Sequence, residues 1–192
     1  MRARWRASWR PRALHLSSFA ANLAKNLQGV RCPQSKCRRE RERAEAFRKR
    51  VLDVSVFLQR IGLREPPAGG GRPLKIAYQD ACHLANAQCV RREPRALLRS
   101  IPNAELCELA DAHLCCGSAG TYNLDQPEIA DSLGEKKARA VIATGADVVA
   151  SGNIGCLTQL RVHLAKLGSP IQVHHTMQVL RDAYAGPESG DG

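Results

Sequence analysis

The sequence has few aromatic residues, and its first forty residues hold almost no acidic side chains. Phe, Trp and Tyr make up 4% of the 192 residues, which excludes an aromatic-rich surface for stacking on bases. Residues 1–40 contain ten Lys and Arg but one acid, a net charge of +9, whereas residues 41–192 contain 19 basic and 17 acidic residues. The formal charge of +11 therefore comes mostly from the N-terminal segment. The rest lacks the basic footprint of a nucleic-acid-binding domain, so no nucleic-acid partner is predicted.

Long apolar runs and a dense set of cysteines are also missing. No stretch approaches the roughly 18 apolar residues of a transmembrane helix, and no apolar stretch long enough for a signal peptide follows the Arg-rich start. Eight cysteines in 192 residues are too sparse for a secreted disulfide scaffold. These absences predict the cytoplasm, a reducing compartment where cysteines serve metal or redox chemistry. Peripheral association with the inner face of a membrane stays open.

The two ends of the chain are predicted to be disordered. Residues 1–40 begin with MRARWRASWRPR, which is basic and without periodicity. This segment resembles a transit peptide, and a non-native leader from a misplaced start explains it equally well. Cys32 and Cys37 are separated by four residues, which fits neither a zinc knuckle nor a bacterial ferredoxin motif. These two cysteines are therefore interpreted as incidental thiols. The tail, residues 186–192, is expected to fray.

From Glu42 onward the apolar pattern predicts alternating helices and strands. A helix is expected over 42–62, because apolar residues recur at steps of three and four, and the Pro- and Gly-rich stretch 65–73 is predicted to be a linker and domain boundary. Alternation beyond it predicts an α/β domain over 73–185, with a mostly parallel sheet of about four strands flanked by helices. Strands are expected at 74–78, 105–109, 146–151 and 171–174, and helices at 93–101, 126–144, 155–167 and 176–184.

Four cysteines follow three successive predicted strands. Cys82 comes after the first strand, Cys115 and Cys116 after the second, and Cys156 after the third. Ligands of open parallel sheets bind beyond the carboxyl ends of the strands, so the four thiols are expected at one edge. Adjacent cysteines rarely bridge each other, because the short ring strains the disulfide. They can supply thiolates to one polynuclear metal centre, which makes these four the predicted metal ligands.

The residues around these cysteines suit a thiolate site. Cys156 stands at the start of a predicted helix, where the helix dipole favours thiolate over thiol. Gly117 lets backbone amides approach sulfur atoms closely. His83 is a candidate to hydrogen-bond a ligated sulfur, with a structural role equally open. Cys107, inside the second strand, and Cys89, in a loop, are interpreted as structural or packing thiols.

Three motifs in this region resemble the cysteine-rich CCG domain: DACHL (80–84), CCGSAGTYNL (115–124) and SGNIGCLTQL (151–160). This domain occurs in heterodisulfide reductase and in iron–sulfur subunits of glycolate, lactate and anaerobic glycerol-3-phosphate oxidising complexes. The stretch 44–184 is most similar to the C-terminal part of the glycolate oxidase iron–sulfur subunit, and it holds one repeat. The general family pattern closes with Cys-x-x-Cys. Asn153, a poor cluster ligand, replaces the first of these cysteines here, as in the glycolate oxidase branch.

The resemblance implies an electron-transfer role beside flavin-containing subunits that oxidise a 2-hydroxy acid such as glycolate. The chain would then be a subunit of an oxidoreductase complex rather than a stand-alone enzyme. A zinc-stabilised assembly or binding module on the same thiolates is an alternative. An inactive fragment is another, because the ferredoxin module and earlier repeat of such subunits are not evident in these 192 residues. The implied site is a [4Fe–4S]-type cluster on Cys82, Cys115, Cys116 and Cys156, with His83, Gly117 and Asn153 around it.

Overall fold

The computed structural model describes residues 35–48, 50–67 and 73–185. Residues 1–34 and 186–192 lie outside the described residues, and so do the predictions of disorder made for them. The chain divides into two units after Val54, whereas the sequence favoured a boundary at 65–73. The described residues of the first unit include one complete helix, and the second unit contains the sheet.

Two helices occupy the segment for which one helix was predicted. Helix α2 (Ser35–Arg48) consists largely of Arg, Glu and Ala, all strong helix formers. Helix α3 (Val54–Ile61) begins after a short non-helical stretch. The prediction of one continuous helix over 42–62 is therefore wrong. Asp53, directly before α3, is a residue type preferred at a helix start, and this local signal outweighs the apolar periodicity that runs across the break.

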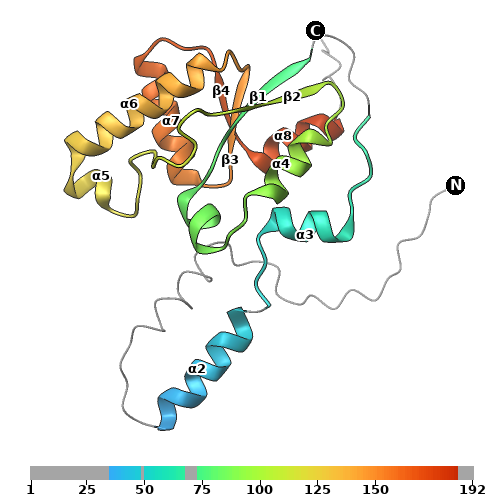
Figure 1. The fold of residues 1–192 in the computed structure, drawn as a ribbon, viewed down its shortest axis with the longest axis vertical. Helices are drawn as coiled ribbons and strands as arrows, with labels where there is room; N and C mark the ends of the chain where they lie inside the picture. Colours follow the sequence, from blue (N-terminus) through green and yellow to red (C-terminus); the bar gives the residue numbers. More distant parts are fainter. Residues whose placement is uncertain (1–34, 49, 68–72, 186–192) are drawn as a thin grey trace, which may run out of the picture. The chain divides into compact units, whose positions relative to one another are not determined.

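The second unit contains a parallel four-stranded sheet with strand order β2-β1-β3-β4 (Figure 1). This parallel sheet with helices between its strands confirms the predicted α/β class. All four strands lie within one or two residues of their predicted positions. Consecutive parallel strands need crossover connections, and helices supply them here. The strands are β1 (Leu74–Gln79), β2 (Ala104–Glu108), β3 (Val148–Ser151) and β4 (Gln172–His175).

Helices cover both faces of this sheet (Figure 1). Helices α6 and α7 pack on one face, and α4 and α8 pack on the other. Two short elements were not predicted from the sequence: a π-helical turn, η2 (His83–Ala87), and a single helical turn, α5 (Tyr122–Asp125). The bounds of the four longer helices are Arg92–Arg99 for α4, Pro127–Ala143 for α6, Ile154–Lys166 for α7 and Thr176–Ala185 for α8.

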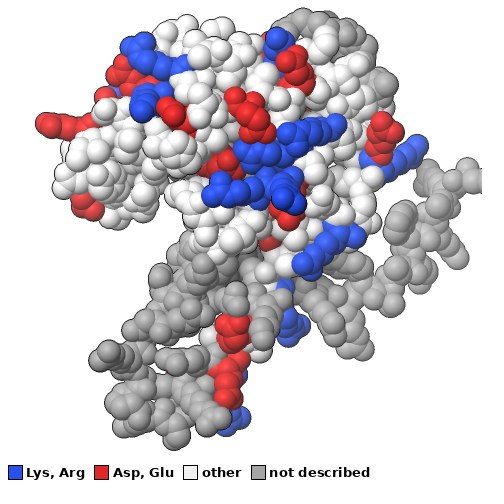
Figure 2. Space-filling model, in the orientation of Figure 1, with Lys and Arg blue, Asp and Glu red and all other residues white. Residues whose placement is uncertain are grey.

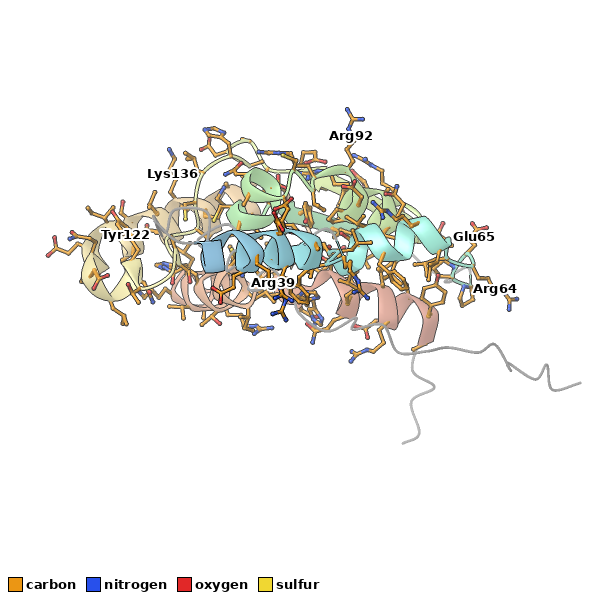
Figure 3. All side chains as sticks on the ribbon, turned by 90° about the horizontal axis from the view of Figure 1, so that it is seen from below. Arg39, Arg64, Glu65, Arg92, Tyr122 and Lys136 are labelled. Carbon is orange, nitrogen blue, oxygen red and sulfur yellow. The ribbon has the colours of Figure 1, made fainter. Side chains whose placement is uncertain are left out.

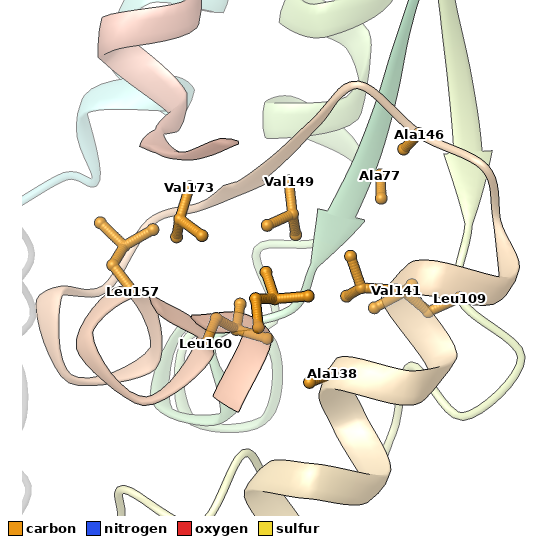
Figure 4. Packing of buried hydrophobic residues seen from close by; sticks show 10 residues of the cluster. Ala77, Leu109, Ala138, Val141, Ala146, Val149, Leu157, Leu160 and Val173 are labelled. Atoms are coloured by element: carbon orange, nitrogen blue, oxygen red, sulfur yellow. The ribbon is translucent and has the colours of Figure 1, made fainter. Parts of the chain in front are cut away.

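Alternate residues of the strands divide between two hydrophobic cores. Ala77 and Val149 face α6 and α7, where they meet Val141 and Leu160 (Figure 4). Their strand neighbours, such as Ile76, belong to the core beneath α4 and α8. Both faces are buried, which explains why the third predicted strand reads as a continuous apolar run rather than as an alternation.

The connections leave the two central strands in opposite directions. Strand β1 leads through α4 to β2, while β3 leads through α7 to β4, and these two helices lie on opposite faces of the sheet. The point between the carboxyl ends of β1 and β3 is therefore the topological switch point of the sheet. In open α/β sheets this is where ligands bind.

Basic and acidic side chains are interspersed on the face of the second unit shown in Figure 2. This agrees with the near-balance of charge in residues 41–192. Among the described helices, none is both long and apolar enough to cross a membrane.

Candidate metal centre

The segments that follow β1, β2 and β3 carry the four predicted cysteines. Cys82 lies three residues beyond the end of β1 and immediately precedes η2. Cys115 and Cys116 lie in the loop between β2 and α5, and Cys156 is the third residue of α7. Cys82 and Cys156 therefore follow the two central strands that flank the switch point. All three segments leave the carboxyl edge of the sheet, where the sequence predicts a metal site.

Cys116 and Cys156 form a buried pair of thiols. Their Sγ atoms are 3.2 Å apart, and the residues are 2% and 4% exposed. The sulfur–sulfur hydrogen bond with Cys156 lowers the pKa of Cys116 to about 6, helped by the backbone N–H groups of Ser118 and Cys116 and opposed by burial. The same hydrogen bond, burial and the charges of the neighbouring cysteines raise the pKa of Cys156. The contact therefore acts on the two thiols in opposite directions, lowering the pKa of Cys116 and raising that of Cys156.

Cys115 and Cys82 lie close enough to this pair to influence its charge. Burial raises the pKa of Cys115, and the backbone N–H of Gly117 acts in the opposite direction. Negative charge on Cys82 or Cys115 also raises the pKa of Cys156. Cys115 is partly buried, whereas Cys82 is exposed. The structure therefore brings two of the four sulfurs into direct contact, and charge on the other two acts on Cys156 of that pair.

Gly117 and Gly155 allow the cysteine-bearing loops to approach helices and each other closely. Gly117 has a φ of +87°, and a Cβ there would meet the Ala130 carbonyl oxygen of α6 at 2.3 Å. A Cβ at Gly155 would meet Ser118 Oγ at 2.7 Å. Glycine at both positions seats the loop after β2 against α6 and against the start of α7. This contact is what places Cys116 opposite Cys156.

Asn153 is the N-cap residue of α7. Its Oδ1 atom accepts a hydrogen bond of 3.1 Å from the backbone N–H of Cys156. Asparagine is among the best residues at this position, because its side chain satisfies an N–H left free at the helix start. Asn153 therefore holds the Cys156 backbone in place through a side-chain hydrogen bond.

The turn that carries Cys82 is fixed by an ion pair that the sequence analysis did not identify. Asp80, 6% exposed, accepts two hydrogen bonds from Arg95 of α4, at 2.9 and 2.8 Å. Arg95 also bonds Glu108 of β2 and lies 4.7 Å above the centre of the Tyr78 ring. A signal was available: an Asp two residues before a candidate ligand, followed by an Arg in the next helix.

Comparison with known proteins agrees with this arrangement. Residues 76–161 match the cysteine-rich domain family, CCG. The chain contains a CCG domain. The match runs from the third residue of β1 to the middle of α7, so it covers the four cysteines, the switch point and Asn153.

Three curated proteins illustrate what the chain is similar to. The chain is 35% identical over 144 residues to a probable glycolate oxidase iron–sulfur subunit of Bacillus subtilis, covering 74% of the chain and 32% of that protein. It is 28% identical over 142 residues to lactate utilization protein A of Exiguobacterium sp., covering 74% and 58%. It is 36% identical over 138 residues to a fumarate reductase (CoM/CoB) subunit of Methanothermobacter marburgensis, covering 70% and 27%. The chain thus spans less than two thirds of each of these relatives.

The donor chemistry of the CCG domain fits a thiolate-bound metal. Two thiolates on one tetrahedral metal lie about 3.8 Å apart when each metal–sulfur bond is about 2.3 Å, and the Cys116–Cys156 separation is 3.2 Å. Within the described ranges, however, no three His, Cys, Asp or Glu side chains are already grouped to hold a metal ion. The exposed thiol of Cys82 has to turn toward the buried pair for one centre to use all four sulfurs.

His83 follows Cys82 in the chain, and the other cysteines lie outside the four predicted ligands. His83 is the first residue of η2 and is partly buried. Cys107 lies within β2, where burial raises its pKa, and Cys89 is exposed with a φ of +58°. Cys32 and the side chain of Cys37 lie outside the described residues.

Proposed function

We propose that this chain is the cysteine-rich part of an iron–sulfur electron-transfer subunit in a complex that oxidises a 2-hydroxy acid such as glycolate. The ligands are Cys82, Cys115, Cys116 and Cys156, and the group they hold is a [4Fe–4S]-type cluster. The observation that carries this proposal is that four cysteines follow three strands of one parallel sheet, with Cys116 and Cys156 in contact beside its switch point. Similarity to a glycolate oxidase iron–sulfur subunit supports the choice of iron and sulfide over zinc.

When bound, an iron–sulfur cluster supplies one-electron transfer, and ligand type, hydrogen bonds and burial set its potential. Cys116 is prepared as a ligand, because the contact with Cys156 and nearby backbone N–H groups lower its pKa and so favour the thiolate form. Asn153 holds the Cys156 backbone, and the Arg95–Asp80 ion pair holds the turn before Cys82. Gly117 lets the loop that carries Cys115 and Cys116 lie against α6. These residues therefore orient sulfur donors and perform no bond-making of their own.

Anaerobic reconstitution of the whole chain with ferrous iron and sulfide tests the ligand assignment. We expect bound iron and acid-labile sulfide, a broad visible absorption that bleaches on reduction, and an EPR signal. Cys116→Ser and Cys156→Ser remove thiolates from the buried pair, so each variant should lose most of its bound iron. Cys89→Ser is the matched control, since it changes an exposed thiol outside the pair, and it should keep the native iron content.

Three results would contradict the assignment. Native iron content in Cys116→Ser or Cys156→Ser would remove the buried pair from the ligand set. One zinc without iron or visible absorption would favour the assembly module. A chain that takes up neither metal would be an inactive fragment.

The electron-transfer role has a separate test. A flavoprotein dehydrogenase is first reduced by its 2-hydroxy acid substrate and then mixed with the reconstituted chain in a stopped-flow instrument, at the pH of the cytoplasm. The reduced flavoprotein should bleach the visible absorption of the chain. If the chain binds iron but no such flavoprotein bleaches its absorption, the proposed metal site stands and the proposed electron donor is wrong.

A further inference from the structure

Lys137 is a buried lysine on the helix that packs against the cysteine-bearing loop. It is 1% exposed, whereas the side chain of its neighbour Lys136 is 61% exposed and points outward from α6 (Figure 3). Lys137 shares the inward face of the helix with Gly134 and Ala138. Lysine is almost never fully buried unless it is paired, because removing its charge from water is costly. A lysine in this position therefore requires an explanation.

No carboxylate within the described ranges forms an ion pair with Lys137. Its Nζ atom donates a hydrogen bond to the backbone carbonyl of Asp111, in the loop between β2 and Cys115. The carboxylate of Asp111 instead lies 3.7 Å from Lys136. A carbonyl takes one of the three ammonium donors and leaves the charge uncompensated. Among the residues that the structure describes, Lys137 thus contacts this loop without a carboxylate in ion-pair distance.

The negative groups that act on Lys137 include two of the four cysteines. Burial lowers the pKa of Lys137, and this is opposed by the charges of Asp111, Cys116, Cys115 and Asp80, in decreasing order. The loop that bears the thiols lies directly against α6, since Gly117 contacts Ala130, about two turns before Lys137. Lys137 is therefore within electrostatic range of both adjacent sulfurs.

We propose that Lys137 is the built-in counter-cation of the thiolate centre, and that it raises the reduction potential of the group bound there. This inference rests on the proposed function. A centre with several thiolate ligands is anionic, and each electron it accepts adds negative charge. A fixed positive charge in a poorly solvated position stabilises the reduced state more than the oxidised state. Lys137 acts through charge and contributes no ligand atom.

Two neutral variants separate charge from hydrogen bonding. Lys137→Met removes both the charge and the donor to the Asp111 carbonyl, whereas Lys137→Gln removes the charge and keeps a donor. The whole chain is reconstituted with iron and sulfide, its iron content is measured, and its potential is determined by redox titration followed by EPR. Lys136→Met is the matched control, because it removes an exposed charge from the adjacent residue of the same helix.

We expect both neutral variants to accept an electron about tenfold less favourably than the native chain, a shift of about 59 mV to lower potential. Lys136→Met should stay near the native potential, because solvent screens an exposed charge. Native potentials in Lys137→Met and Lys137→Gln, at native iron content, would overturn the inference while leaving the proposed function intact. A lowered potential in Lys137→Met that Lys137→Gln restores would also overturn it, since the hydrogen bond would then be responsible. A native chain that binds no iron would remove the proposed function, and this inference with it.

Discussion

At the scale of single residues, Gly117 combines two constraints that no other residue type meets. Its φ of +87° lies in the region that favours glycine, and the Ala130 carbonyl occupies the space of a Cβ. Gly120, three residues further along, also has a positive φ of +57°, but nothing lies within 4 Å of its Cβ position. Substitutions at Gly117 and Gly120 therefore distinguish the cost of backbone strain from the cost of a steric clash.

Gly117→Ala should lower the free energy of unfolding by at least about 2 kcal/mol, because it adds a clash with α6 to the cost of a positive φ. Gly120→Ala should cost only about 1 kcal/mol, from backbone strain alone. Urea denaturation followed by circular dichroism measures both values. Equal losses in the two variants would show that the contact with Ala130 relaxes freely.

The residues that sequence reasoning found and missed differ in kind. Cys82, Cys115, Cys116 and Cys156 were identified because a thiol after a predicted strand is visible in the sequence. Arg95 and Lys137 were missed, because nothing in local sequence states that a charged side chain is buried. A weak signal existed for Lys137, which falls on the apolar face of its helix.

At the scale of elements, Arg95 links α4 to the ends of two strands. Its guanidinium group bonds Asp80 beyond β1 and Glu108 in β2, and its side chain is 13% exposed. These two carboxylates raise the pKa of Arg95, so the group is charged at all accessible pH values. The neighbouring Arg99 reaches Glu108 at 3.4 Å from a side chain that is 59% exposed.

Arg95→Met should lower the free energy of unfolding by about 3–5 kcal/mol, since it leaves the buried Asp80 carboxylate without its partner. Arg99→Met is the control, and it should cost at most about 1 kcal/mol, because an exposed ion pair contributes little. Chemical denaturation of both variants provides the measurement. A loss below about 1 kcal/mol for Arg95→Met would mean that water replaces the arginine at Asp80.

Element boundaries show where sequence patterns suffice and where they fail. The strands and the long helices were predicted well, because apolar periodicity and Gly or Pro at the ends are local signals. The division between α2 and α3 was missed, because apolar residues continue at helical spacing through the break. The π-helical turn after Cys82 was missed as well, since a π-helix depends on the packing around it more than on residue propensity.

At the scale of the whole molecule, the metal and the fold should stabilise each other. Ligand binding to the folded state raises stability, and a ligand at a hundred times its dissociation constant contributes about 2.7 kcal/mol. For a chain of this length that corresponds to a rise of roughly 5–11 °C in melting temperature. Cobalt(II) is a suitable probe, because thiolate ligation produces a visible charge-transfer absorption.

Cobalt(II) at this excess should therefore raise the melting temperature of the native chain by about 5–11 °C, and a chelator should reverse the change. The double variant Cys116→Ser/Cys156→Ser should show no such rise, because it lacks the buried thiol pair. Differential scanning calorimetry under anaerobic conditions gives both values. An equal rise in the double variant would place the stabilising metal at other side chains.

The sequence by itself determined the α/β class, the order of its elements and the position of four cysteines after three strands of one sheet. Local periodicity specifies the elements, and parallel topology brings the carboxyl ends of all strands to the same side. Only the tertiary structure decided which sulfurs face each other, which asparagine caps the ligand helix, and which charges are buried beside the thiols. Those outcomes depend on how the loop after β2 packs against α6 and α7, and packing between segments far apart in the chain leaves no periodic trace in the sequence.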